Sequence, residues 1–411
     1  MTRCLYLPLA ALLGLAACHS NTSDNTTAAT TPPATAPAPA EAKAASSPGA
    51  AYAVYRGVVP GQPDSVTLHL VTTPQPRYDN TGPSTQGSYY GPDGHPYDLG
   101  SQPSASPDSL VLADYSPEHG TGPTNPPPLW RLRREPGGIL AGTLNGQATR
   151  LRLVAAPAGA LTFAVRYFAD SLAAYPRRKE SPKGRLHFQA LLPGGGPAAA
   201  RVALTAAMAR DLRGDTLDNL PAPDLTAYYK QQRDTFFTNY RRDVRELAGD
   251  SPDEQPSATL NYADQTATYV LFHQGSLLSL GFFSYTYSGG AHGMNTTRVA
   301  SYDLRTGRRL RYDDIFQPTA AARLPALLDA GVRAAMGLKR GEPLSQSLLV
   351  DKVPVTHNVF LTSGGVEFVY QPYEVAAYAF GEVRVFLPLA QLRGLLREGL
   401  PLPGAAGVAA R

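Results

Sequence analysis

Cysteine is almost absent from this 411-residue sequence, and its two copies, Cys4 and Cys18, both lie within the first 18 residues. Residues 19–411 therefore offer no disulfide, no cysteine-ligated metal site and no cysteine nucleophile. Apolar packing alone must hold the folded part together, although disulfides are common in oxidising compartments. The chain is long enough to bury such a core, and its length predicts about two or three domains.

A strong excess of either charge is also missing. The sequence has 37 Lys and Arg against 33 Asp and Glu, which gives a formal net charge of +4. Proteins that bind nucleic acids carry concentrated positive charge, so we expect no nucleic-acid partner. After Cys18 there is no apolar run of the roughly 20 residues that a membrane-spanning helix needs.

The residue spacings of common active sites are absent too. The eight histidines include no pair four residues apart and no His-Glu-x-x-His motif. No Gly-x-Ser-x-Gly nucleophile elbow occurs. The acidic residues Glu367, Glu374 and Glu382 show no spacing typical of a catalytic carboxylate pair. We therefore predict no catalytic residue, no metal ligand and no cofactor.

The first 18 residues, by contrast, have a clear pattern. A positive Arg3 precedes the apolar stretch Leu5–Leu15, which is typical of an export signal and too short to span a bilayer. The small residues before Cys18 resemble the lipobox of bacterial lipoproteins, which implies cleavage before Cys18 and its lipidation. Several acyl chains anchor a protein stably, because each buried CH₂ contributes about 0.8 kcal/mol. We therefore expect membrane attachment through Cys18, in the bacterial cell envelope and facing the periplasm or exterior.

Residues 19–50 are rich in Ala, Thr, Pro and Ser and predict a disordered tether. Residues 51–155 then alternate short apolar stretches with turn residues. Val66, Leu68 and Leu70 alternate as on one face of a strand, and Trp130 is expected in the core or at its rim. This pattern predicts an all-β domain of unknown role, a small barrel or sandwich of roughly six to eight strands.

From about residue 160 helical and strand patterns mix, which predicts an α+β fold: a C-terminal antiparallel sheet with packed helices. We expect a first α+β domain at 160–300 and a second at 301–400. The strand at 277–288 is apolar on both faces and should lie centrally in its sheet. The other predicted strands are 257–263, 266–274, 297–304, 355–361, 366–371 and 383–387, and the predicted helices are 200–212, 225–247, one opened by Pro318, and 389–400.

The sequence Ser288-Gly289-Gly290-Ala291-His292-Gly293 follows the central strand. Gly289 and Gly290 permit positive φ, and His292 can hydrogen-bond within the turn. Because distant ligands and a nearby nucleophile are not evident, the pattern favours a structural turn first and a partner contact second. A catalytic or metal-binding role for His292 is the least favoured of the three.

A second segment, residues 369–388, places Pro372 and Tyr373 at the end of a strand and adds Tyr378 and Phe380 in the following loop. Such a loop can simply close the core. Exposed tyrosine beside proline also suits a rigid recognition surface, because tyrosine offers large contact area at little entropic cost.

The order of these motifs resembles the extracytoplasmic module of RsiV-like proteins, with a PdaC-type part before an RsiV-like C-terminal part, over about residues 160–400. The motifs are Tyr285–Gly293, Asp303–Gly307, Asp314–Phe316 and Pro372–Ala376 with Gly381. The resemblance implies a module that works by binding. In RsiV-like anti-sigma factors it recognises lysozyme, and in deacetylase relatives it accompanies a separate catalytic domain that acts on peptidoglycan.

Carried over to this sequence, the resemblance implies a set of partner-binding residues: Ser288, Gly289, Gly290, His292, Pro372 and Tyr373. No sigma-binding segment and no polysaccharide deacetylase domain is recognisable. We therefore expect a non-enzymatic, lipid-anchored envelope protein that binds a lysozyme-like protein or a cell-wall glycan, peptidoglycan. The alternative is a cell-wall-directed hydrolase with a site near His292.

Overall fold

The computed structural model describes residues 45–62, 64–74, 84–104, 106, 108–116, 126–215, 220–248 and 257–403. The predicted signal, the predicted lipidation site Cys18 and most of the predicted tether lie outside this range. The end of the predicted tether pairs with the fold: Val165 N donates to Ser46 Oγ at 3.0 Å, and Ser47 N donates to Val165 O at 2.8 Å. Ser46 and Ser47, predicted as part of the tether, therefore belong to the fold.

The predicted all-β domain is a closed antiparallel barrel of eight strands, in which β1 pairs with both β2 and β8. Its interior holds Val66, Leu68, Leu70 and Trp130, all at most 3% exposed, as the alternation predicts. The strands are β1 (Ala51–Val58), β2 (Ser65–Thr73), β3 (Ser84–Tyr90), β4 (Pro96–Gln102), β5 (Ser109–Asp114), β6 (Leu129–Glu135), β7 (Ile139–Leu144) and β8 (Gln147–Leu153).

A six-stranded sheet follows, in the order β14-β13-β12-β11-β10-β9. All its neighbours are antiparallel except β10 and β11, which run parallel where Arg185–Phe188 faces Ala263–Thr266. A parallel pair needs a long crossover, and two helices supply it here. The sheet therefore departs from the expected antiparallel arrangement at this one pair. The elements are β9 (Thr162–Ala173), β10 (Lys183–Gly194), α1 (Ala198–Arg213), α2 (Leu225–Ala248), β11 (Ala263–Gln274), β12 (Leu277–Tyr287), β13 (Met294–Asp303) and β14 (Arg308–Leu310).

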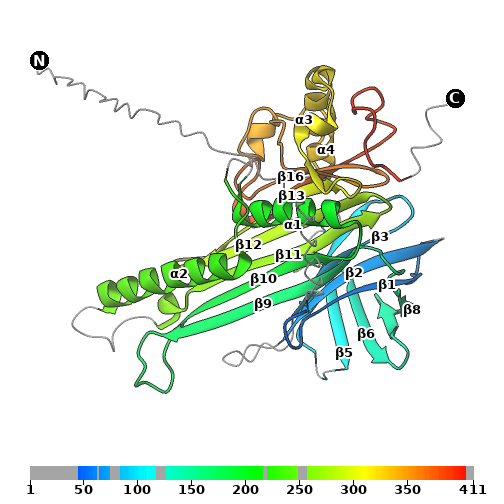
Figure 1. Cartoon of the computed structure of the whole chain (residues 1–411). Helices are drawn as coiled ribbons and strands as arrows, with labels where there is room; N and C mark the ends of the chain where they lie inside the picture. The colour runs from blue at the N-terminus through cyan, green and yellow to red at the C-terminus, as the bar shows by residue number, and fades with distance from the viewer. Residues whose placement is uncertain are drawn as a thin grey trace, which may run out of the picture. The chain divides into compact units, whose positions relative to one another are not determined.

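Both faces of β12 are covered, as its sequence predicts. Leu278, Leu280 and Phe282 face the layer of α1 and α2, which run along one side of the sheet (Figure 1). On the opposite face, the Ser279 hydroxyl donates to Leu361 O at 2.7 Å and Phe283 faces the barrel side. The predicted domain boundary at residue 300 falls inside β13, a neighbour of β12 in the same sheet.

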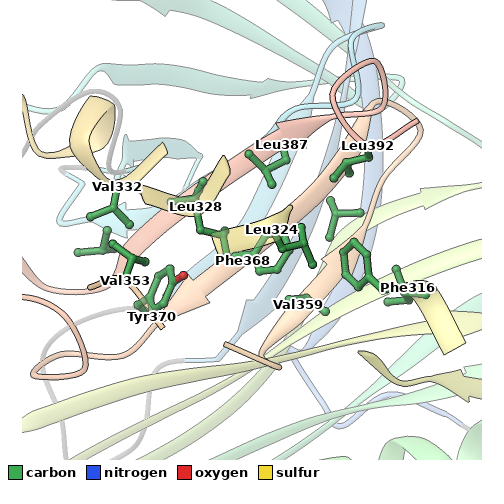
Figure 2. Packing of buried hydrophobic residues seen from close by; sticks show 14 of the residues in the cluster. Phe316, Leu324, Leu328, Val332, Val353, Val359, Phe368, Tyr370, Leu387 and Leu392 are labelled. Atoms are coloured by element: carbon green, nitrogen blue, oxygen red, sulfur yellow. The ribbon is translucent and has the colours of Figure 1, made fainter. Parts of the chain in front are cut away.

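The last part of the chain builds a three-stranded antiparallel sheet covered by α4. Leu324, Leu328 and Val332 of α4 are fully buried against Phe368 and Tyr370 of the sheet (Figure 2). The elements are α3 (Tyr312–Ile315), η3 (Pro318–Ala322), α4 (Leu324–Ala335), η4 (Leu344–Gln346), β15 (Val359–Leu361), β16 (Gly365–Tyr370), η5 (Tyr378–Phe380) and β17 (Val383–Pro388).

Two predicted elements are wrong. The strand expected at 257–263 is instead the 3₁₀ turn η2 (Ser257–Leu260), since Leu260 packs on α2 and its carbonyl accepts from the Tyr240 hydroxyl at 2.9 Å. The helix expected at 389–400 is a series of turns. Gly394 has a φ of +71° there, outside the helical region, while Leu392 and Leu395 remain buried.

Candidate functional site

The turn between β12 and β13 has the geometry that its glycines predict. Gly289 and Gly290 both have a φ of +89°, and the Tyr287 hydroxyl donates to Gly290 O at 3.0 Å. The exposed His292 ring lies 2.9 Å through Nδ1 from Gly293 O, so Nδ1 carries the proton in this contact. Ser288 and Gly290 are exposed as well, so the turn is held from within and open to solvent.

The Pro372–Tyr373 segment is a tight loop at the end of β16. Gln371 N donates to Glu374 Oε2 at 2.9 Å, and Tyr373 N donates to Ala376 O at 3.0 Å. Pro372 is buried, so only Tyr373 of this predicted pair offers surface for contact. Tyr373 is 49% exposed and has a φ of +70°, which a side chain with Cβ rarely adopts. The loop therefore holds an exposed ring on strained backbone, a combination that is frequent at binding sites.

The turn that holds His292 and the Pro372–Tyr373 loop come together in space through the ring of Tyr378. The His292 ring stacks on Tyr378 with 3.9 Å between centroids, and Tyr378 stacks on Tyr373 at 5.8 Å. The Gln371 side chain also joins the loop to β13, since it accepts from Thr297 N and donates to Thr297 O. We call His292, Tyr373, Tyr378 and the 56% exposed Phe380 the aromatic surface.

Replacing Tyr373 by glycine should leave a more stable protein than replacing it by alanine, by about 1 kcal/mol. The left-handed conformation costs a residue with Cβ roughly 1–2 kcal/mol, more than the chain entropy that glycine loses on folding. Urea unfolding of Tyr373→Gly and Tyr373→Ala measures the difference. Equal stability of the two variants would show that the backbone at this position carries no strain.

Beside the aromatic surface lies a cavity of about 690 Å³, and Phe380 belongs to both. Its walls come from β3 and β4 of the barrel, from β11, β12 and β13 of the six-stranded sheet, and from residues 379–384. Its polar and charged lining includes Asp98, Gln265, Tyr269, Asn295, Glu382 and Arg384.

A buried charge cluster forms one wall of this cavity. Arg384, with 5% of its side chain exposed, donates through Nη2 to Asp98 Oδ2 at 2.6 Å and to Glu382 Oε2 at 3.1 Å. The Tyr269 hydroxyl donates to the same Asp98 oxygen at 3.3 Å. Burial opposes the charge of Arg384, but Asp98, Tyr269, Glu382 and Glu367 raise its pKa well above the usual value. Burial, with Asp98, also raises the pKa of Tyr269, which keeps its proton as a donor.

Reasoning from the sequence missed this cluster. Asp98 lies in the barrel, 171 residues before its partner Tyr269, so no local spacing announces the contact. Tyr378 is the centre of the aromatic stack, but the sequence shows it only as one aromatic residue in a loop. Among the residues that the structure describes, no group of three or more His, Cys, Asp or Glu side chains is arranged to hold a metal ion. Within the same residues no helix is long and apolar enough to cross a membrane.

Two known families match parts of the chain. Residues 212–295 match the family described as "Deacetylase PdaC", and residues 313–390 match "Protein of unknown function (DUF3298)". The predicted PdaC-type part is thereby confirmed, whereas the RsiV-like assignment of the last part stays a prediction. None of the curated proteins matches this chain.

Solved structures of DUF3298 family proteins resemble the chain. One from Bacteroides fragilis is 23% identical, covers 58% of this chain and 94% of its own, and has a TM-score of 0.50. Another, from Pseudomonas aeruginosa, is 20% identical over 58% of this chain and 95% of its own, with a TM-score of 0.42. At such identity the Bacteroides structure supports the fold alone, an α+β arrangement.

Proposed function

We propose that this protein is a non-enzymatic, lipid-anchored protein of the bacterial cell envelope that binds the glycan of peptidoglycan through the aromatic surface. The single observation that carries the proposal is the stack in which half-buried Tyr378 packs against the exposed rings of His292 and Tyr373. Tyr378 fixes the two exposed rings, and a ring face that remains open to solvent suits the C–H groups on the flat side of a sugar ring.

Two further observations support this function. The PdaC and DUF3298 matches indicate an extracytoplasmic protein related to the cell wall. The signal pattern and Cys18 would place the protein there, tethered by lipid. A lysozyme-like protein is the second candidate, supported by the resemblance to RsiV-like proteins. The formal charge of +4 offers no general attraction to a strongly basic lysozyme, which favours the glycan.

Tyr378→Ala should weaken binding to peptidoglycan about tenfold, because an aromatic anchor at the centre of a contact commonly contributes more than 1 kcal/mol. Co-sedimentation of the full chain with insoluble peptidoglycan measures the loss. Tyr378→Phe keeps the ring and should bind like the parent protein. Val202→Ala, at a 68% exposed position on α1, is the matched surface control.

Co-sedimentation with peptidoglycan, capture of lysozyme and a peptidoglycan-hydrolysis assay together separate the alternatives. Unchanged sedimentation of Tyr378→Ala would overturn the aromatic surface as the binding site. Capture of lysozyme without capture of peptidoglycan would replace the glycan by the protein partner. Hydrolysis of peptidoglycan by the parent protein but not by His292→Ala would establish the hydrolase alternative instead.

A further inference from the structure

The cavity beside the aromatic surface has the size of a small-molecule site. Its volume of about 690 Å³ lies within the roughly 300–1,000 Å³ typical of ligand pockets. Strands of the barrel and of the six-stranded sheet both wall it, so its shape depends on the packing of the two.

The wall of the cavity carries an excess of negative charge. Asp98 and Glu382 line it together with Arg384, the one basic residue among the described lining residues. Glu367, 1% exposed, adds a third carboxylate to the surroundings of Arg384. In the wall itself one guanidinium thus stands against two carboxylates, and a second positive charge brought by a ligand would be stabilised there.

The hydrogen bonds of the cluster are incomplete in the same place. Arg384 occupies Asp98 Oδ2 and Glu382 Oε2, whereas Asp98 Oδ1 and Glu382 Oε1 are buried without a hydrogen-bond partner among the described residues. The Glu382 side chain is 10% exposed. Both oxygens lie beneath the surface of the cavity wall, and no donor offsets their charge, so they attract a cation in the cavity through space.

The other lining residues narrow the class of ligand. Gln86, Gln265 and Asn295 offer amide groups that can both donate and accept, and Phe283 and Phe380 offer ring surface. Amides suit hydroxyl groups, rings suit the apolar side of a sugar, and the carboxylates suit an ammonium group. We propose that this cavity binds a hexosamine unit whose amino group is free and protonated. The inference rests on the proposed function and names the ligand class that would accompany glycan binding.

Calorimetric titration of the full chain with glucosamine oligosaccharides tests the proposal, with N-acetylglucosamine oligosaccharides of equal length as the neutral comparison. We expect the amine form to bind at least tenfold more tightly, and Glu382→Gln to remove most of that preference. Asn295→Leu, which narrows the cavity but keeps the charge cluster, should weaken the amine form as well. Circular dichroism of each variant checks that it is folded.

Three results would overturn the inference: equal affinity for both oligosaccharides, an unchanged preference in folded Glu382→Gln, or an unchanged affinity of folded Asn295→Leu for the amine form. Equally tight binding of cadaverine, an amine without a sugar, would overturn the hexosamine assignment. Failure of the proposed function can be told apart from failure of this inference. In the first case the full chain would not sediment with peptidoglycan, although it still prefers the glucosamine oligosaccharide. In the second case Tyr378→Ala would lose sedimentation with peptidoglycan, but the parent protein would show no glucosamine preference. That result would overturn only the cavity site.

Discussion

Replacement of Arg384 by methionine is expected to lower the free energy of unfolding by about 3–5 kcal/mol, the usual cost of removing one partner from a buried ion cluster. Methionine retains much of the apolar length of arginine, so the loss reports the charge. Without the guanidinium, Asp98, Glu367 and Glu382 would face one another in a region where Arg384 itself is only 5% exposed. No other basic residue lies among the described residues that line the cavity.

Urea unfolding followed by circular dichroism and by the fluorescence of Trp130 measures this loss. Trp130 is fully buried in the barrel, so its fluorescence reports barrel unfolding while circular dichroism reports the whole chain. Because Asp98 of β4 and Arg384 of β17 join the barrel to the last sheet, the loss should appear in both signals.

The matched control combines Arg384→Met with Asp98→Asn and Glu382→Gln. Neutral amides at positions 98 and 382 remove two of the three carboxylates that face Arg384, so the triple variant should recover much of the stability. A loss below about 1 kcal/mol in the single variant would contradict the account, because that is the size of an exposed ion pair.

The second large effect concerns pH and the buried histidine of the barrel. His69 is 2% exposed and lies between two tyrosines, with 2.7 Å from Nδ1 to the Tyr52 hydroxyl and 3.1 Å from Nε2 to the Tyr90 hydroxyl. The Tyr90 hydroxyl donates to His273 O at 2.6 Å, so its oxygen accepts from His69 Nε2–H. His69 Nδ1 must then accept from Tyr52, and this network holds the neutral ring.

Burial, with a further contribution from His273, lowers the pKa of His69 to about 3. The unfolded chain has an ordinary histidine pKa of about 6.5, so between these values the unfolded state binds more protons. Stability is therefore complete above about pH 6.5 and is lost as the pH falls toward 3. From pH 7 to pH 5 the expected loss is about 2 kcal/mol, since one pKa unit corresponds to about 1.4 kcal/mol.

Urea unfolding at pH 7 and pH 5 tests this expectation against His69→Gln, which can accept from Tyr52 and donate to Tyr90 without titrating. The parent protein should lose about 2 kcal/mol more than the variant. Burial also lowers the pKa of His273 and raises that of Asp264 to about 6. Both groups are present in the parent protein and in the variant, so their contributions largely cancel when the two pH dependences are compared. Equal pH dependence of the two proteins would show that His69 is not the sensitive group.

Local pattern alone determined most of the elements. Alternation at Val66, Leu68 and Leu70 predicted a barrel strand, and the apolar faces of Leu277–Tyr287 predicted a central strand. The glycines at 289 and 290 predicted their own backbone geometry. These features follow from the sequence because the residues that cause them are neighbours in the chain.

Tertiary contact decided the rest. Packing on α2 turned the predicted strand at 257–263 into a 3₁₀ turn, and the crossover through α1 and α2 made one pair of strands parallel. The stack of His292 on Tyr378 and the ion pair of Asp98 with Arg384 join residues far apart in the sequence. Such contacts depend on how whole sheets pack, and their residues carry no periodicity or spacing in the chain. The motif around His292 could therefore be found in the sequence, whereas the surface and cavity that surround it could not.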